Sequence, residues 1–147
     1  MESGPLVLDT DTLSELCRGN LRIREQAASY LAKFGRLTLT SITAFERLRG
    51  YQLAITDGQP FERQLQAFEA LLSASIVLPF DEEAARVAAR IWSSVARKHR
   101  RHIGDILIAA VAVSRQLPLV TRNRRDFVRL AAASGIDLRL VNWMDGH

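Results

Sequence analysis

The chain is poor in cysteine, and this scarcity argues against two classes of site. Cys17 is the only cysteine among 147 residues, so an internal disulfide is excluded. A single free cysteine is compatible with a reducing cytosol, and we expect a cytoplasmic protein. With only three histidines in the chain, the sequence also disfavours a zinc site built from cysteine and histidine.

Long apolar runs are missing as well. The longest covers residues 106–113, far short of the ~20 residues that a membrane-spanning helix needs. The first residues, MESGPLVLD, lack the basic and apolar regions of a secretory signal. Hydrophobic residues nevertheless make up 48% of the chain. We therefore expect one folded domain over residues 1–147, with no membrane partner.

Lysine is scarce, and arginine carries almost all of the positive charge. The net charge is +4, and Lys33 and Lys98 are the only lysines among 20 basic residues. Arginine suits bidentate contacts with phosphate and carboxylate groups. The bias is consistent with a polyanionic partner, although an arginine-rich genome accounts for it equally well.

Apolar runs that alternate with helical patterns predict an α/β domain with a mostly parallel sheet of about five strands. Strands are expected at residues 6–8, 37–40, 76–78, 119–121 and 137–141. Helices are expected at residues 10–18, 21–34, 41–54, 61–73, 81–98, 106–115 and 126–134. The turn sequence TDGQP joins two of these helices into an αα-hairpin, which we interpret as a clip over the sheet or a partner surface.

Four acidic residues stand where the expected elements meet. Asp9 directly follows the first strand, and Glu46 lies near the start of the helix after the second strand. Asp105 opens the apolar helix at residues 106–115, and Asp126 opens the last helix. Each acid also has a simpler interpretation, because Asp is a common N-cap and Glu46 completes a capping box with Thr43. An ion pair with neighbouring arginines is a further interpretation for Asp126.

Taken together, the four acids predict a metal site. The carboxyl ends of parallel strands share one edge of the sheet, and ligands bind there in open α/β sheets. Two carboxylates 4 Å apart repel each other by ~4 kcal/mol at an effective dielectric of 20, so several of them require protonation or a cation. Oxygen ligands favour Mg²⁺ or Mn²⁺, which activate water and neutralise charge on a phosphate. The residues expected to hold a nucleic-acid backbone are Arg97, Lys98, Arg100, Arg101, Arg122, Arg124 and Arg125.

Four segments carry a resemblance to a known family, and they read LDTDTLSEL, TSITAFERLRG, GDILIAAVA and LVTRNRRDF. In this order they resemble the PIN-domain ribonucleases, and most closely the VapC-type toxins of toxin–antitoxin pairs. The resemblance spans nearly the whole chain. It implies a three-layer α/β/α PIN-like domain and a metal-dependent endoribonuclease that cleaves RNA, often tRNA. It also implies a homodimer and a VapB-like antitoxin bound at the active-site groove.

The resemblance also implies roles for single residues. Asp9, Glu46 and Asp105 would bind Mg²⁺ or Mn²⁺ and position the attacking water. Asp126 matches the acid of an Asn-x-x-Asp-Phe variant, whereas other members carry their fourth acid at the position of Asn123. The fourth ligand therefore stays open between these two positions. The residues expected to support the ligands or to reach the metal through water are Asp11, Thr121 and Asn123.

Two features depart from the family pattern, and two alternatives stay open. Asp11 stands where many relatives have Asn or Ser, and HIG precedes Asp105 where some members have a proline. The run DTDT also fits a haloacid-dehalogenase-like phosphatase that uses Asp9 as nucleophile and Asp11 as acid/base. The second alternative is an RNA-binding module of the same fold without catalysis, in which the acids serve only as helix caps.

Overall fold

A parallel sheet of five short strands forms the middle of the molecule in the computed structural model, which describes residues 4–145. The spatial order is β3-β2-β1-β4-β5, so the first strand of the chain lies at the centre. Every strand pairing is parallel. The strands are β1 (Val7–Leu8), β2 (Thr38–Thr40), β3 (Ile76–Leu78), β4 (Leu119–Val120) and β5 (Leu140–Val141).

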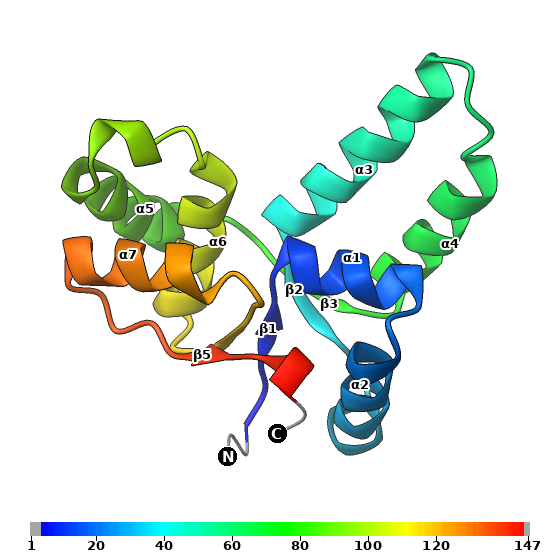
Figure 1. The fold of residues 1–147 in the computed structure, drawn as a ribbon, viewed down its shortest axis with the longest axis horizontal. Helices are drawn as coiled ribbons and strands as arrows, with labels where there is room; N and C mark the ends of the chain where they lie inside the picture. Colours follow the sequence, from blue (N-terminus) through cyan, green and yellow to red (C-terminus); the bar gives the residue numbers. More distant parts are fainter. Residues whose placement is uncertain (1–3, 146–147) are drawn as a thin grey trace.

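Helices cover both faces of the sheet, and this confirms the three-layer α/β/α prediction (Figure 1). The helices are α1 (Thr10–Arg18), α2 (Leu21–Phe34), α3 (Ser41–Thr56), α4 (Glu62–Ser73), α5 (Glu82–Ser94), α6 (Ile103–Ser114) and α7 (Arg124–Ser134). Two single-turn helices, η1 (Arg97–His99) and η2 (Trp143–Asp145), complete the described elements. No helix within residues 4–145 is long and apolar enough to cross a membrane.

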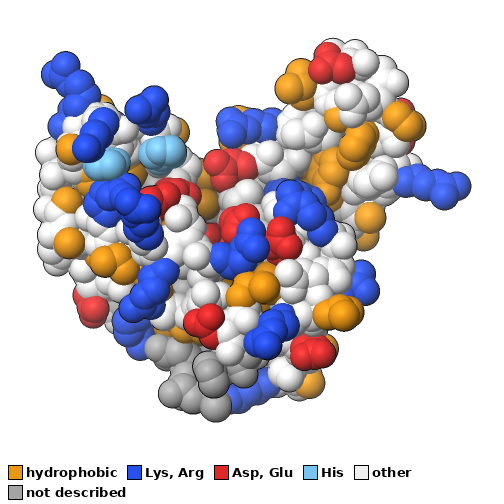
Figure 2. Space-filling view, viewed as in Figure 1, with side chains coloured by type: hydrophobic (Ala, Val, Ile, Leu, Met, Phe, Trp, Pro, Cys, Tyr) orange, Lys and Arg blue, Asp and Glu red, His pale blue; other side chains and the backbone are white. Residues whose placement is uncertain are grey.

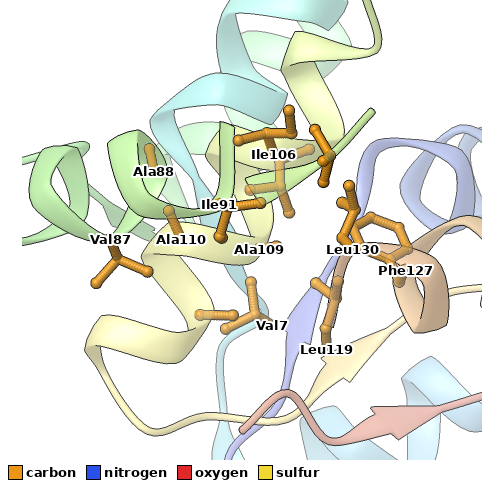
Figure 3. Close-up of a cluster of buried hydrophobic side chains, with 13 residues drawn as sticks. Val7, Val87, Ala88, Ile91, Ile106, Ala109, Ala110, Leu119, Phe127 and Leu130 are labelled. Carbon is orange, nitrogen blue, oxygen red and sulfur yellow. The ribbon is translucent and has the colours of Figure 1, made fainter. Parts of the chain in front are cut away.

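The central strand takes part in both hydrophobic cores. Val7 belongs to the cluster beneath α5, α6 and α7, whereas Leu8 belongs to the cluster beneath α1 and α2. Neighbouring residues of a strand point to opposite faces, and both side chains are fully buried. Figure 3 shows Val7 and Leu119 packed against Phe127 and the residues of α5 and α6. The apolar run of β1 was therefore correctly interpreted as a strand buried on both faces.

The αα-hairpin consists of α3 and α4, which pack against each other and project beyond the sheet (Figure 1). Gly58 lies in the turn between them with a φ of +86°, a backbone conformation that glycine adopts without steric cost. The prediction of this hairpin is confirmed. The helix α3 extends to Thr56, slightly further than the predicted end at residue 54.

The predicted helix at residues 81–98 is wrong at its end. The helix α5 ends at Ser94, and Val95 has an extended backbone with a ψ of 154°. The basic residues that follow form the separate turn η1. Successive positive charges repel one another, and Val95 is buried, so the chain turns inward at this point instead of continuing into solvent. The start of the next helix also differs, because α6 begins at Ile103 and contains Asp105.

Candidate active site

A cleft of about 470 Å³ lies at the carboxyl edge of the sheet, between the lobe of α5, α6 and α7 and the lobe of α1, α3 and α4. Three of the four acids that the sequence singled out line it, namely Asp9, Glu46 and Asp105. Asp11 and Asn123 line it as well. In Figure 2, acidic side chains gather in the hollow between the two lobes, and basic side chains surround them.

Asp9 joins the end of β1 to the start of α1. It is the N-cap of α1, and its Oδ1 accepts a hydrogen bond of 2.8 Å from the Thr12 amide. Asp9 is 3% exposed, and burial raises the pKa of its carboxyl group, while hydrogen bonds from Thr121 and Thr12 oppose this rise. The capping interpretation is thus correct for Asp9. Because the two oxygens of a carboxylate offer about four lone pairs, the capped Asp9 keeps acceptor capacity for a ligand in the cleft.

Asp105 carries the strongest sign that the acids converge. Its pKa is raised to about 6, first by burial and then by the charges of Asp9, Asp126 and Glu46. These three acids belong to three other parts of the chain, yet each acts on one carboxyl group. His102, the only opposing charge among the causes of the shift, is the weakest of them. Asp105 is the third residue of α6 rather than its cap, which places the acid at the favourable end of the helix dipole.

Glu46 reaches across the cleft instead of capping its own helix. The N-cap of α3 is Thr40, which accepts the Thr43 amide at 3.1 Å, so the capping-box interpretation is wrong. The Glu46 carboxylate accepts a 2.6 Å hydrogen bond from the Thr10 hydroxyl on α1. Its other oxygen lies against Gly104, so closely that a Cβ at that position would collide with it. Glu46 and the residue before Asp105 are therefore in contact.

Asp126 and Asn123 share the start of α7. Asn123 is the N-cap residue, and its Nδ2 donates a 2.9 Å hydrogen bond to Asp126. Arg129 also forms an ion pair of 3.2 Å with Asp126, as the simpler interpretation of this acid expected. Asn123 lines the cleft, whereas Asp126 is not among its lining residues and acts on Asp105 only through its charge. The Thr121 hydroxyl accepts the Asn123 amide at 2.8 Å and so holds this loop beside Asp9.

Asp11 is tied to an arginine that the sequence suggested for phosphate binding. Arg122 donates to both Asp11 oxygens, at 2.8 and 3.2 Å, and lies 3.6 Å from Glu15. The pKa of Arg122 is raised, chiefly by the hydrogen bond with Asp11. The added charge of Asp11 is thus compensated within the protein. Of the neighbouring arginines, Arg124 and Arg125 are exposed.

The basic segment between α5 and α6 lies on the other rim. Arg100 stacks on Trp92 with its guanidinium 4.2 Å from the ring centroid, and its Nε donates to the Trp92 carbonyl. Arg101 and His102 line a second hollow of about 400 Å³ that also reaches Glu46 and Asp105. Arg97 and Lys98 are exposed. This segment therefore flanks the acids without lining the main cleft.

The donor atoms that line the cleft suit a hard cation, although the carboxylates do not converge on a single point. The donors are carboxylate oxygens, the ligands that Mg²⁺ and Mn²⁺ prefer. Within residues 4–145, no three carboxylate or imidazole groups stand close enough together to form a finished metal site. Each of Asp9, Glu46 and Asp126 has a local hydrogen-bond or ion-pair partner that holds it in place. Burial raises the pKa of Asp105 most, and the charges of Asp9, Asp126 and Glu46 raise it further despite these contacts.

Comparison with known proteins agrees with this geometry. The PIN domain family model matches residues 6–133. The chain belongs to the PIN-domain family. The ribonuclease VapC5 of Mycobacterium tuberculosis is 34% identical over 100 residues, which is 67% of this chain and 73% of the relative. The tRNA(fMet)-specific endonuclease VapC of Shigella flexneri is 32% identical over 127 residues, 82% of this chain and 89% of the relative.

A solved structure supports the same assignment for this PIN domain. The crystal structure of DNA-bound VapBC from Salmonella typhimurium matches it with a TM-score of 0.76 and 30% identity. The match covers 95% of this chain and 98% of the other. Within the family, the chain is of the VapC ribonuclease toxin type, whose members are typically metal-dependent. The resemblance seen in the sequence is confirmed, and the phosphatase alternative is wrong.

Seven cleft residues of this PIN domain escaped the sequence analysis. They are Thr10, Ser14, Arg18, Arg47, Arg49, Gly50 and Tyr51. Thr10 bridges Glu46 and Thr43 through its hydroxyl, and Arg49 lies 4.0 Å from Glu46. Their positions directly after Asp9 and around Glu46 are the one signal that the sequence contained. Which residue of a helix turns toward a partner helix depends on packing, and no local pattern reports it.

Proposed function

We propose that this PIN domain is a Mg²⁺- or Mn²⁺-dependent endoribonuclease, with Asp9, Glu46 and Asp105 as the metal ligands. The observation that carries the proposal is that Asp9, Glu46 and Asp105 come from distant parts of the chain and line one cleft. The pKa of Asp105, raised to about 6 by burial and by three other acids, agrees with this arrangement. Such a pocket favours a divalent cation, because the cation relieves the repulsion without protonation. We propose Asn123 rather than Asp126 as the fourth metal ligand. Asn123 lines the cleft, whereas Asp126 is ion-paired with Arg129.

The protein contributes orientation and charge to the reaction. A bound Mg²⁺ supplies a more acidic water and neutralises charge on the scissile phosphate. The Thr12 amide fixes one oxygen of Asp9, and the Thr10 hydroxyl fixes one oxygen of Glu46. Because one oxygen of each carboxylate is fixed, the second oxygen has a defined orientation. This lowers the entropic cost of forming the reactive complex. Asp11, Thr121 and Asn123 support this arrangement through Arg122, Asp9 and Asp126 respectively.

The proposed substrate is RNA of the tRNA class. A relative of this chain is a tRNA(fMet)-specific endonuclease, which supports the proposal. Basic side chains flank the acidic cleft and suit a phosphate backbone on either side of the cut. The proposed backbone contacts are Arg97, Lys98, Arg100, Arg101, Arg124 and Arg125, with Arg122 available only if its ion pair with Asp11 opens.

The proposed partners are a VapB-like antitoxin and a second copy of this chain, in the cytoplasm. Solved relatives include VapBC of Salmonella typhimurium and VapBC-5 of Mycobacterium tuberculosis, a member of the VapBC family of toxin–antitoxin systems, and they support an antitoxin partner. We propose that this antitoxin covers the active-site groove. We further propose that residues 1–147 fold as a single domain. Light scattering of the chain with and without a co-expressed antitoxin measures both associations. A protein that stays monomeric under both conditions would reject this part of the proposal.

The decisive experiment is metal-dependent cleavage of a tRNA pool by the purified chain. Cleavage is expected with Mg²⁺ or Mn²⁺ and lost in EDTA. Asp9→Asn and Asp105→Asn should each reduce the rate by about 100-fold or more, because a few kcal/mol of charge stabilisation is lost. Asp137→Asn is the matched control, since Asp137 is exposed and lies outside the cleft.

Circular dichroism must show that the variants are folded before their rates are compared. Full cleavage by both folded variants would reject the metal assignment. RNA binding without cleavage under any metal condition would instead favour the non-catalytic module.

A further inference from the structure

Three arginines line the cleft together with the acids, and none of them belongs to the basic set that the sequence suggested. They are Arg18 on α1 and Arg47 and Arg49 on α3. The side chains of Arg18 and Arg49 are 66% and 62% exposed, and each has an acidic neighbour on its own helix. Arg47 differs from both, because it is partly buried and forms no ion pair within the described residues.

Contacts from three helices hold the Arg47 side chain in place. Its guanidinium lies 5.0 Å from the centroid of the Tyr51 ring and 5.5 Å from that of Phe68. Nη1 donates a 3.0 Å hydrogen bond to the Ser14 hydroxyl on α1, and Nη2 donates to the Tyr51 hydroxyl. The planar group is therefore fixed against two aromatic rings, and Arg47 lines the same cleft as the acids. Such preorganisation reduces the entropy lost when a ligand binds.

The donors of Arg47 are not used up by these contacts. The Nε atom is buried and has no hydrogen-bond partner, and each terminal nitrogen carries a second hydrogen. A partly buried cation without an anion is costly, whereas an uncharged side chain of similar length would pack against the same rings. The hydroxyl and ring partners of Arg47 are neutral, so they hold the guanidinium without neutralising its charge. An anion that enters the cleft from outside would neutralise it.

We propose that Arg47 is a substrate-binding residue that holds a phosphate of the RNA beside the scissile bond. This inference rests on the proposed nuclease function, which brings a phosphodiester into the cleft. Carboxylates and a hard cation bind one side of that group, and the opposite side needs a cationic donor that does not compete for the metal. Guanidinium meets this requirement, because it binds phosphate oxygens with two parallel hydrogen bonds and stays charged at every working pH.

The test measures binding of a fluorescein-labelled single-stranded RNA by anisotropy, in EDTA and at several salt concentrations. Arg47→Met should weaken binding about tenfold, since a charge-assisted pair is lost. The slope of log affinity against log salt should fall in magnitude by about 0.7, the value for one phosphate contact on a single strand. Arg47→Lys should restore the slope and only part of the affinity. Arg86→Met, an exposed arginine paired with Glu82 on α5, is the control and should change neither quantity.

A purely structural role gives a different pattern. Arg47→Met would then lower the melting temperature and leave both the affinity and the salt slope at the control values, which would overturn the inference. If Arg47→Met fails to fold, Arg47→Lys and Tyr51→Phe decide the question. The second variant keeps the ring and removes the hydroxyl that accepts from Arg47, and it should weaken RNA binding about threefold while the salt slope stays. Unchanged affinity in both variants would also overturn it.

The two proposals fail separately in this design. If cleavage depends on metal but RNA affinity does not change in the Arg47 variants, only this inference is rejected. Arg47-dependent binding without any cleavage would instead remove the nuclease proposal.

Discussion

Asp105 is the residue whose negative charge is least compensated among those that line the cleft. Its neighbours on other elements are acids, and within residues 4–145 no arginine or lysine forms an ion pair with it. The folded protein therefore binds a proton at this side chain up to about pH 6. A divalent cation competes with that proton for the same oxygens, so metal affinity should rise as the pH rises through this range.

The first prediction concerns the stability of the metal-free protein against pH. The pKa of Asp105 is higher in the folded state than in the unfolded state, so stability is lost as the pH rises from about 4 to about 6. Asp105→Asn cannot lose a proton and should escape this loss. In EDTA the variant should match the parent near pH 4 and melt about 2–4 °C higher at pH 7, for a net effect of about 1 kcal/mol. Thermal unfolding followed by circular dichroism measures the difference, and a gap independent of pH would contradict the assignment.

A second prediction concerns Gly104, the residue before Asp105. A methyl group at this position would collide with the Glu46 carboxylate, so Gly104→Ala should push that side chain away from Asp105. Because the carboxylate is the movable end of a flexible side chain, the fold should survive. The cleavage rate should fall about 10- to 100-fold, a range typical of variants that misplace a metal ligand.

The double variant with Glu46→Gln is the control for this prediction. If Gly104→Ala acts through Glu46, it should cost little more once Glu46 is already disabled. If the activation free energies lost in the two single variants add fully in the double variant, Gly104 does not act through Glu46.

At the scale of elements, the first four strands followed from the sequence more closely than the helix ends did, whereas the strand expected at residues 137–141 is shortened to Leu140–Val141. The run from Leu6 to Leu8 is apolar throughout, and only a position buried on both faces stabilises such a run. Helix boundaries depend on which of several polar residues takes the cap. Capping was the simpler interpretation of Asp105, because Asp prefers that position, yet His102 occupies it and forms no side-chain cap.

The candidate site was predictable as a set of acids and not as a set of contacts. Strand order places Asp9 and the helix starts at one edge, and that much is topology. The bond between Thr10 and Glu46 depends on how α1 packs against α3, which no local pattern reports. The same holds for Arg47, whose partners lie 33 positions earlier at Ser14 and on the neighbouring helix at Phe68.

A third prediction concerns the segment between α5 and α6. Arg100 and Arg101 lie on the rim of the acidic cleft, and Arg100 is held against Trp92. Replacing both with Gln should weaken RNA binding and reduce the salt slope by about 1.4, the value for two phosphate contacts on a single strand. The pair Arg86→Gln and Arg90→Gln on α5 removes the same charge elsewhere and serves as the control. Equal losses in the two double variants would indicate a general charge effect instead.

At the scale of the whole molecule, the part of the chain that the structure describes has two hydrophobic clusters, one on each face of a thin sheet. The strands are only two or three residues long, and β1 contributes to both clusters. Neither layer can therefore keep its core when the other is lost. This argues that the described residues unfold as one cooperative unit, in line with the proposed single domain.

The fourth prediction tests that cooperativity. Trp143 is buried in the cluster beneath α1 and α2, whereas Trp92 lies exposed on α5. In a Trp92→Phe variant, fluorescence reports one layer and far-ultraviolet circular dichroism reports the helices of both. The two urea transitions should coincide, with the same midpoint and slope. Separate midpoints would divide the chain into two domains.

Because β1 lies at the centre of the sheet, its position determines when the active cleft can form during synthesis of the chain. Asp11, just after β1, forms an ion pair with an arginine 111 positions later, and β1 pairs with β4, which is translated long after it. A nascent chain on the ribosome consequently holds the first acid of the cleft long before Asp105 and the loop after β4 have been translated. The cleft is therefore complete only once that loop has been made, and from that moment the antitoxin has a formed groove to bind.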